Sequence, residues 1–373
     1  MVEDFVAHLE ETVELRPEEA SVLRASGVRS YDGLDALTRC YPSIHTLGVR
    51  VPWLSSLASR RLSARYRAEA AAMSDGRPIR RANATSGAKH PNGARWPPGA
   101  IVPKPVRVAR SSAARVATLA PIDLRRANWP VRDQGDRGTC VAFGAAAALE
   151  LSILGTQNGT PPDMSEQFLY WAIKTGTRDP DPGIDGSLLE FAHEALGSIG
   201  ICTEGHWPYN GMVIPGNVSH GGSGSPTPAA RKDATGHVLN STHFQMLNGS
   251  GGVAAVLGAL QNGRAAAITL PVFSDPTMPG GADNWNTALA LAYGDVLDPP
   301  PTASQVGGHA VCVVGFVPDA MEANGGFFIV RNSWDTGWAQ NAPSPGNGYS
   351  PAPGYGTISA QYVENFLWEI LVP

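Results

Sequence analysis

The stretch that decides the fold is residues 134–154, QGDRGTCVAFGAAAALELSIL, in which a short polar loop leads into a mostly apolar run. The run from residue 140 to 154 predicts a buried helix, because alanine has the highest intrinsic helix propensity and no polar face is present. Cys140 stands at its beginning, where unpaired backbone N–H groups and the helix dipole stabilise a thiolate and lower the thiol pKa. A catalytic cysteine is expected in such a place, since the thiolate is the nucleophilic form. The alternative is a small apolar residue that begins a core helix.

Two apolar segments further along the chain carry polar residues that can complete such a site. Residues 306–315, VGGHAVCVVG, place His309 at the mouth of one strand, and residues 327–334, FFIVRNSW, place Asn332 at the end of the next. If these strands are antiparallel neighbours, Asn332 can accept a hydrogen bond from one ring N–H while the imidazole takes the proton of the thiol. A tryptophan two residues after Asn332 would cover this hydrogen bond from water and strengthen it.

These segments, in this order, resemble the papain family of cysteine peptidases. The resemblance is carried by residues 130–143, 164–167, 308–310 and 332–338, and it covers roughly residues 119–373. It implies a papain-like α+β fold with two lobes, one helical and one resembling a β-barrel, and it implies no cofactor and no metal. The expected activity is that of a cysteine-type endopeptidase, which cleaves peptide or protein substrates through a thioester acyl-enzyme.

The resemblance also assigns a role to individual residues. It implies Cys140 as the nucleophile, His309 as the acid and base, Asn332 as the group that orients the imidazole, and Gln134 as a donor to the oxyanion. For substrate binding it implies Gly186, Asp185, Gly308 and Trp334. Asp185 stands where many relatives have a second glycine, so the subsite around it departs from the family pattern.

The cysteines and the apolar runs exclude several classes of protein. The four cysteines lie far apart, which excludes a dense disulfide framework and a zinc ribbon. Arg137 stands where many family members have a disulfide cysteine, and the loss of that bridge fits a reducing compartment. The start, MVEDFVAHLE, lacks an apolar leader, and no stretch reaches 18 apolar residues, so a cytoplasmic protein without a membrane span is the default. Export by a non-classical route would leave no trace in the sequence.

Charge divides the chain into three regions. Residues 1–75 hold 9 basic and 11 acidic residues and predict a small helical N-terminal domain, a pro-region or a regulatory or partner-binding unit. Residues 76–118 predict a Pro/Gly/Arg-rich linker, of which residues 76–115 hold 9 basic and no acidic residues. Residues 119–373 predict the peptidase domain, and residues 116–373 hold 10 basic and 22 acidic residues. Opposite charges attract, so we expect the 1–118 region to contact the catalytic cleft. Nucleic-acid binding is disfavoured, because the linker has few aromatic residues and no recognisable motif.

The remaining elements follow from local patterns. Ser165 is an expected helix N-cap. We expect helices at residues 165–174 and 187–196, and strands at 265–273, 309–317 and 327–331. Beyond about residue 235 the pattern is mainly that of strands, and insertions are expected at 211–236, 274–307 and 339–354.

Two other functions stay open at the level of sequence. A peptidase-like domain can serve as a binding module or scaffold, with the N-terminal region recruiting a partner. The same thiol chemistry can also pass the acyl group to an amine instead of water, which makes the protein an acyl-transferase.

Overall fold

The computed structural model describes most of the chain from residue 119 onward, together with a short upstream segment. The described residues are 93–95, 119–155, 159–211, 224–239, 242–247, 250–274, 303–318, 323–340 and 352–373, with scattered positions in 6–23 and 283–299. The expected N-terminal domain at 1–75 and the linker at 76–118 lie outside these residues, except for residues 93–95 and a few mostly helical positions between Val6 and Leu23.

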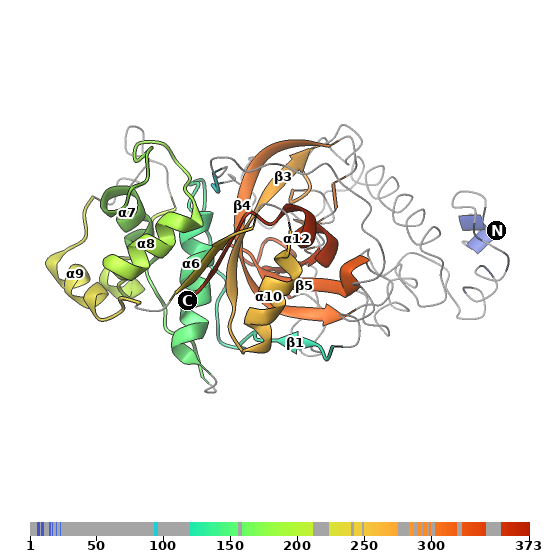
Figure 1. Ribbon diagram of the computed structural model, residues 1–373, viewed down its shortest axis with the longest axis horizontal. Coiled ribbons are helices and arrows are strands. Elements are labelled where there is room, and N and C mark those ends of the chain that lie inside the picture. The colour runs from blue at the N-terminus through green and yellow to red at the C-terminus, as the bar shows by residue number, and fades with distance from the viewer. Residues whose placement is uncertain are drawn as a thin grey trace.

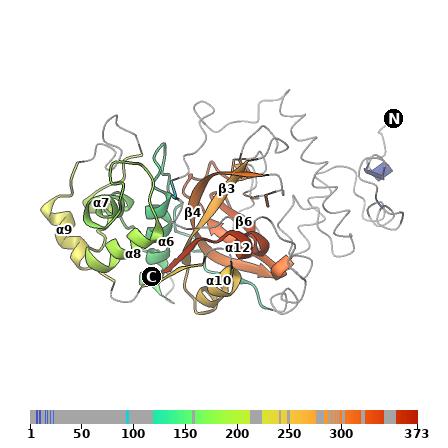
Figure 2. The same ribbon diagram turned by 45° about the horizontal axis from the view of Figure 1, so that its top comes forward.

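Two halves pack against each other across helix α6 (Cys140–Leu154). The helical half holds α7 (Glu166–Gly176), α8 (Leu189–Ser198), η1 (Glu204–His206) and α9 (Pro228–Thr235). Figure 1 shows these helices on one side of α6 and the strands on the other, and Figure 2 shows the same division from a second direction. The predicted two-lobed α+β arrangement is confirmed.

The second half is an antiparallel sheet flanked by two helices, α10 (Gly252–Gln261) and α12 (Ala360–Phe366). Six strands follow the order β2-β7-β3-β4-β5-β6, and β1 pairs with β4 outside this path. The strands are β1 (Ile122–Asp123), β2 (His243–Met246), β3 (Ala266–Ser274), β4 (Ser304–Pro318), β5 (Gly326–Arg331), β6 (Tyr355–Ser359) and β7 (Glu369–Val372). The short helix η3 (Ala323–Gly325) precedes β5.

Both faces of the central strands are buried, which explains their continuous apolar sequences. On β3, Ala267 belongs to the core that surrounds α6, whereas Ile268 and Leu270 belong to the core beneath α10 and α12. The same alternation occurs on β4, where Cys312 faces α6 and Val313 faces the other core. The sheet therefore separates two hydrophobic cores and fixes α6 against its inner face.

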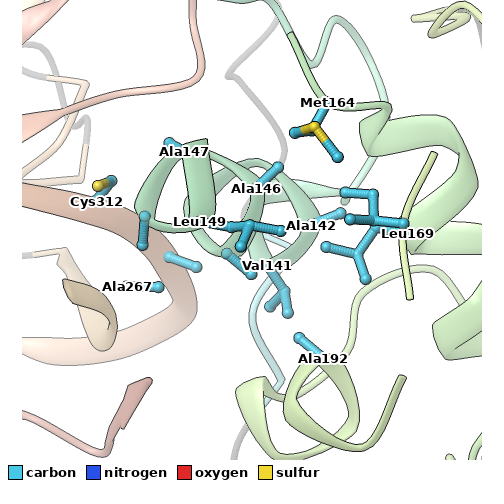
Figure 3. Close-up of a cluster of buried hydrophobic side chains, with 14 of the residues drawn as sticks. Val141, Ala142, Ala146, Ala147, Leu149, Met164, Leu169, Ala192, Ala267 and Cys312 are labelled. Carbon is cyan, nitrogen blue, oxygen red and sulfur yellow. The ribbon is translucent and has the colours of Figure 1, made fainter. Parts of the chain in front are cut away.

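Helix α6 is buried on all sides from Cys140 to Leu151, as its sequence predicts. Figure 3 shows Met164 and Leu169 at one side of the helix, and Ala267 and Cys312 at the other. Small side chains permit this close packing: a Cβ added to Gly144 would lie 3.4 Å from the backbone of Val311 in β4. The alanine-rich sequence thus brings the helix N-terminus close to the strand that follows His309.

The predicted elements match the structure where local signals define them. Helix α6 has the predicted bounds, and Ser165 caps α7 by accepting a hydrogen bond from the Phe168 N–H at 3.0 Å. Strands β4 and β5 contain the predicted runs, and β3 begins and ends one residue later than predicted. The predicted start of the next helix at residue 187 is wrong, because the backbone of Ser187 pairs with residues 93–95 and α8 begins at Leu189. The mainly β pattern beyond residue 235 is interrupted by α10 and α12, which cover the outer face of the sheet.

Two helices have their N-termini capped by a glutamate from another element. Glu369 on β7 accepts hydrogen bonds from the backbone N–H groups of Leu189 and Glu190, at 3.2 and 3.1 Å, at the start of α8. Glu364 on α12 accepts two from the start of α10, from Gly251 and Val253, both at 3.0 Å. Such contacts satisfy the free N–H groups of the first turn and tie the helices to their neighbours.

Candidate active site

Cys140, His309 and Asn332 come from the three elements that meet between the halves: the start of α6, strand β4 and the end of β5. Strands β4 and β5 are antiparallel neighbours, which is the condition under which the sequence allows Asn332 to reach His309. The backbone of Ala310, the residue after His309, lies close enough to the Cys140 thiol to lower its pKa in part. The structure therefore brings the predicted nucleophile to the strand that carries the predicted base.

A hydrogen bond to Asn332 and contacts with aromatic rings hold the His309 ring. Its Nε2 lies 2.8 Å from Asn332 Oδ1, which also accepts the Ser333 backbone N–H at 2.8 Å. An amide oxygen can only accept, so Nε2 carries the proton and Nδ1 is the basic nitrogen of the neutral ring. Trp334 is buried, and its ring centroid lies 4.6 Å from that of His309.

A second tryptophan completes this aromatic enclosure and was missed by the sequence analysis. Trp285 is fully buried and meets the His309 ring edge-on, with centroids 4.9 Å apart. It also stacks on Trp338 at 6.5 Å. It belongs to the region predicted as an insertion at 274–307, where nothing in the local sequence indicates contact with a histidine on β4.

Gln134 lies in the loop before α6 and is fully buried. Its Oε1 accepts the Ser333 hydroxyl at 2.6 Å, and its Nε2 donates to the carbonyl oxygen of Arg137 at 2.7 Å. Its backbone N–H also donates to the Ser333 carbonyl at 2.8 Å. These bonds fix the Gln134 amide beside the residue that follows Asn332.

Arg137 and Asp185 join the loop before α6 to the rest of the helical half. Arg137 is buried, donates to Gln167 Oε1 and to the Asn210 carbonyl at 2.7 Å each, and lies over the rings of two tyrosines. Asp185 accepts hydrogen bonds from the Gly138 N–H and a tyrosine hydroxyl, both at 2.5 Å. In this chain hydrogen bonds and cation–π contacts thus connect the loop at Arg137, where the family resemblance implied a lost disulfide.

Residues 93–95 of the expected linker lie directly in the site. Ala94 N–H donates to the Gly308 carbonyl at 3.1 Å, on the residue before His309. On the other side, Ser187 N–H donates to the Gly93 carbonyl at 2.9 Å, and Arg95 N–H donates to the Ser187 carbonyl at 2.8 Å. Ala94 and Ser187 form a parallel bridge. The segment is therefore held as a short strand between the two halves.

Two of the glycines that the resemblance implied for substrate binding lie where this segment approaches most closely. A Cβ on Gly186 would lie 2.6 Å from the Gly93 oxygen, and the φ of Gly186 is +86°. A Cβ on Gly308 would lie 2.5 Å from the Ala94 oxygen. Only residues without a side chain leave room here for another backbone.

The predicted lowering of the Cys140 pKa is wrong for this structure. Burial raises the pKa of the Cys140 thiol to about 12, and the backbone groups of Ala310, Gly93 and Val141 offset this only in part. Cys140 is fully buried, with the segment 93–95 beside it. The loss of water around the sulfur outweighs the helix N-terminus, so the thiol is protonated in this form of the protein.

The described residues give few other candidates for a site. Cys140, Cys202 and Cys312 are buried free thiols. Within the described part of the chain, no group of three or more His, Cys, Asp or Glu side chains is arranged to hold a metal ion. Of the helices described, none has the length and apolar character to cross a membrane.

A cysteine at a helix N-terminus, beside a histidine held by an asparagine, is typical of enzymes in which a thiol attacks a carbonyl group. The model of the papain family cysteine protease matches residues 120–342. Cysteine proteinase 1 of Entamoeba histolytica is 25% identical over 214 residues, which are 57% of this chain and 57% of the relative. Cathepsin J of Rattus norvegicus is 26% identical over 218 residues, which are 57% of this chain and 54% of the relative.

The fold is also similar to that of a solved bacterial structure. The crystal structure of xylellain, a cysteine protease from Xylella fastidiosa, superposes with a TM-score of 0.53 at 20% identity and covers 77% of this chain and 98% of that chain. Because the family model matches more than half of the residues, the chain belongs to the papain family of cysteine proteases. It spans little more than half the length of the curated relatives it matches.

Proposed function

We propose that this chain is a cysteine peptidase that hydrolyses peptide bonds with Cys140, His309 and Asn332, and that residues 93–95 keep the resting form inactive. The observation that carries the proposal is the 2.8 Å pair of His309 Nε2 and Asn332 Oδ1 beside the strand residue that contacts the Cys140 thiol. Asn332 fixes the ring so that Nδ1 is the nitrogen that takes the thiol proton.

The reaction follows from these positions. The proton of Cys140 Sγ moves to His309 Nδ1, and the thiolate attacks the carbonyl carbon of the peptide bond. The C–N bond breaks, the amine leaves with the proton from His309, and a thioester remains. Water then attacks the thioester with His309 as base, which releases a carboxylic acid and restores the thiol.

Gln134 is proposed to stabilise the oxyanion of both tetrahedral intermediates. Its side-chain NH2 group lies in the loop before Cys140 and donates to the Arg137 carbonyl, and a primary amide carries two N–H bonds. The backbone N–H of Cys140 is the second donor. Donors of this kind typically contribute about 3 kcal/mol to transition-state stabilisation.

The resting state requires the segment 93–95 to leave before a substrate can bind. The segment uses the backbone groups of Ser187 and Gly308 that a substrate strand would need, and Cys140 is fully buried beside it. Its displacement exposes the sulfur to water and restores the conditions under which the helix N-terminus and His309 favour a thiolate. We therefore propose a regulatory role for the region that contains residues 93–95.

The test compares the full chain with its Cys140→Ala variant, and with Cys202→Ala as a matched control for loss of a buried thiol. Because the segment 93–95 covers Cys140, each protein also carries Arg95→Gln, which removes the ion pair of this segment with Asp179. Each is incubated with a mixture of peptides, and the products are identified by mass. Cleavage by the full chain and Cys202→Ala, but not by Cys140→Ala, supports the proposal. Product masses that show transfer to an amine instead of water indicate an acyl-transferase. Equal cleavage by all three proteins would contradict the assignment of Cys140.

A further inference from the structure

We infer that Asp179 and Asp181 form a subsite for an arginine side chain of the substrate, and that Arg95 of the same chain occupies this subsite in the resting form. The inference rests on the proposed function, in which the cleft beside Cys140 binds a peptide. It adds a specificity that neither the catalytic residues nor the family comparison assigns.

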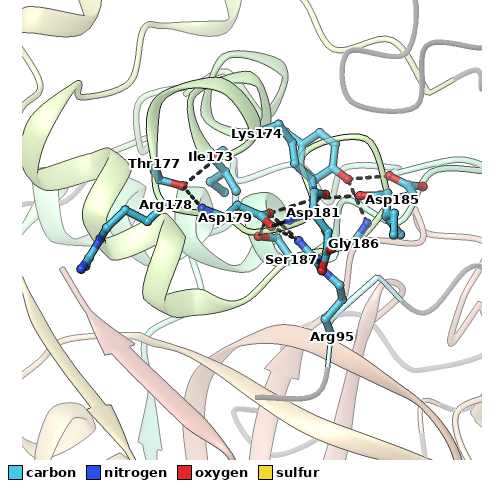
Figure 4. A network of polar contacts seen from close by, with 12 residues as sticks. Arg95, Ile173, Lys174, Thr177, Arg178, Asp179, Asp181, Asp185, Gly186 and Ser187 are labelled. Atoms are coloured by element: carbon cyan, nitrogen blue, oxygen red, sulfur yellow. Dashed lines mark hydrogen bonds and ion pairs between the residues drawn. The ribbon is translucent and has the colours of Figure 1, made fainter. Parts of the chain in front are cut away.

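The guanidinium of Arg95 contacts both carboxylates. Its Nη1 donates to Asp181 Oδ2 at 2.7 Å, and its Nη2 donates to both oxygens of Asp179. Figure 4 shows Arg95 reaching from below into this group of acidic residues. Because the backbone of the same residue pairs with Ser187, Arg95 marks where a side chain lies when an extended peptide occupies this part of the cleft.

The subsite is held together by contacts that do not involve Arg95. The Asp179 side chain is fully buried and accepts hydrogen bonds from Lys174 Nζ at 2.9 Å, Ser187 Oγ at 3.0 Å and the Asp181 N–H at 3.0 Å. Lys174 Nζ, also fully buried, donates to the carbonyl oxygens of Ile184 at 2.8 Å and of Gly186 at 2.5 Å. The pocket therefore keeps its shape when Arg95 leaves, so little ordering is needed when a ligand enters.

The charges of the subsite are balanced only when a second cation is present. Burial would raise the pKa of Asp179, but hydrogen bonds from Lys174, from the Asp181 backbone and from Arg95 outweigh it and lower the pKa. Asp179 is therefore ionised, and when Arg95 leaves, Lys174 is the cation among the described residues that contacts its carboxylate. A second positive charge from a ligand restores the balance at the buried Asp179 carboxylate.

The geometry favours arginine over lysine. One guanidinium reaches two separate carboxylates through different nitrogens, Nη1 to Asp181 and Nη2 to Asp179. A lysine ammonium is a compact point charge and lacks this planar fork, so it cannot reproduce both contacts with equal geometry.

Alkylation of Cys140 tests the inference without requiring catalysis. The full chain carrying Arg95→Gln is treated with iodoacetamide, and modification of the Cys140 peptide is followed by mass spectrometry. We expect faster alkylation than in the wild-type chain, because the segment has lost its side-chain anchor. Acetyl-Gly-Ala-Arg-amide should slow alkylation again, the lysine peptide should be weaker, and the glutamine peptide should have no effect at the same concentration.

Asp181→Asn is the variant that probes the subsite, since Asp181 is half exposed and its replacement leaves Asp179 and Lys174 in place. In the Arg95→Gln background it should weaken protection by the arginine peptide about tenfold. Asp123→Asn is the matched control, because it removes the carboxylate of a residue on β1 that is bound to Arg125. It should leave the protection by the arginine peptide unchanged.

Equal effects of the arginine and glutamine peptides, including no effect of either, would overturn the inference. So would an Asp181→Asn protein that behaves like Asp123→Asn. Hydrolysis of the same peptides is measured in parallel. Selective protection by the arginine peptide without hydrolysis would support the subsite and contradict the proposed peptidase activity. Hydrolysis without a preference for arginine at any position of the peptide would support the peptidase activity and contradict the subsite.

Discussion

The Cys140 thiol is subject to two opposing influences. Its place at the N-terminus of α6 favours the thiolate, whereas complete burial favours the neutral form and raises the thiol pKa to about 12. Burial has the larger effect on the pKa, because the segment 93–95 and the part of β4 that follows His309 exclude water from the sulfur. The pKa of the Cys140 thiol therefore depends on how completely neighbouring residues bury it.

The pH dependence of alkylation should report this state of Cys140. A raised pKa means that the thiolate fraction, and with it the rate of alkylation, should still rise beyond about pH 9 in the wild-type chain. In Arg95→Gln the rate should level off at a lower pH, because the sulfur is more often in contact with water. Rates measured with iodoacetamide from about pH 6 to 10 check this, and a plateau near neutral pH in the wild-type chain would contradict it.

Arg137 allows a second prediction at the scale of a residue. Arg137→Lys keeps the charge but loses the planar group that donates to Gln167 and the Asn210 carbonyl. Because buried acceptors lose a charged donor, the free energy of unfolding should fall by about 1–3 kcal/mol, measured by urea denaturation. Arg178→Lys, at a side chain that is 79% exposed, is the control and should change it little. Equal stability of the two variants would be evidence against a structural role for Arg137.

Among the elements, α8 shows how one side chain connects distant parts of the chain. Leu188 at its N-cap makes no capping hydrogen bond through its side chain, and Glu369 on β7 accepts the first N–H groups instead. Burial raises the pKa of Glu369 to about 7, although these N–H groups and the Thr269 hydroxyl lower it in part. The link between α8 and β7 therefore depends on pH.

Glu369→Gln should remove this dependence. A carboxyl whose pKa is raised in the folded state contributes stability that is fully present below its unfolded pKa and is lost as pH rises through the folded value. The wild-type chain should therefore lose up to about 3 kcal/mol of unfolding free energy between pH 4.5 and 8 through this group. The glutamine variant, compared by urea denaturation at several pH values, should lack this loss.

Glu364→Gln is the matched control for this measurement. It removes the charge from a glutamate that caps α10 in the same manner at a half-buried position. If the free energy of unfolding changes with pH in the same way in wild type and in Glu369→Gln, ionisation of Glu369 does not destabilise the folded protein.

Local patterns in the sequence were sufficient to predict α6 and the Ser165 cap, because each depends on neighbours along the chain. The order of Cys140, His309 and Asn332 was likewise visible. Trp285 and the Arg95–Asp179 pair could not be predicted, since each meets its partner through the folding of the whole chain. The predicted direction of the Cys140 pKa shift was wrong for the same reason. The segment 93–95 contributes to the burial of the thiol, and the sequence around residue 140 does not reveal this contact.

At the scale of the whole molecule, two regions of the sequence carry opposite net charges. Residues 76–115 hold 9 basic and no acidic residues, whereas residues 116–373 hold 10 basic and 22 acidic. Arg95 is the described residue through which this attraction acts at Asp179 and Asp181. General attraction and one specific anchor thus both favour the covered state of Cys140.

Salt should therefore open the cleft. Raising the ionic strength from about 0.05 to 0.5 M screens the tethered charges, so alkylation of Cys140 by the neutral reagent iodoacetamide should become severalfold faster in the wild-type chain. In Arg95→Gln the effect should be smaller, because the specific anchor is already absent. A rate independent of salt in both proteins would show that backbone pairing alone holds the segment.

The place of β7 in the sheet has a consequence for biosynthesis. Residues 369–372 are paired on both sides, with β2 and with β3, so β2 cannot join the sheet until they have emerged from the ribosome. Glu369 in the same strand caps α8, so the N-terminus of α8 lacks this cap until residue 369 has been synthesised. Residues 93–95 are translated long before this moment. They are therefore available to pair with Ser187 and Gly308 as soon as the two halves of the protein fold.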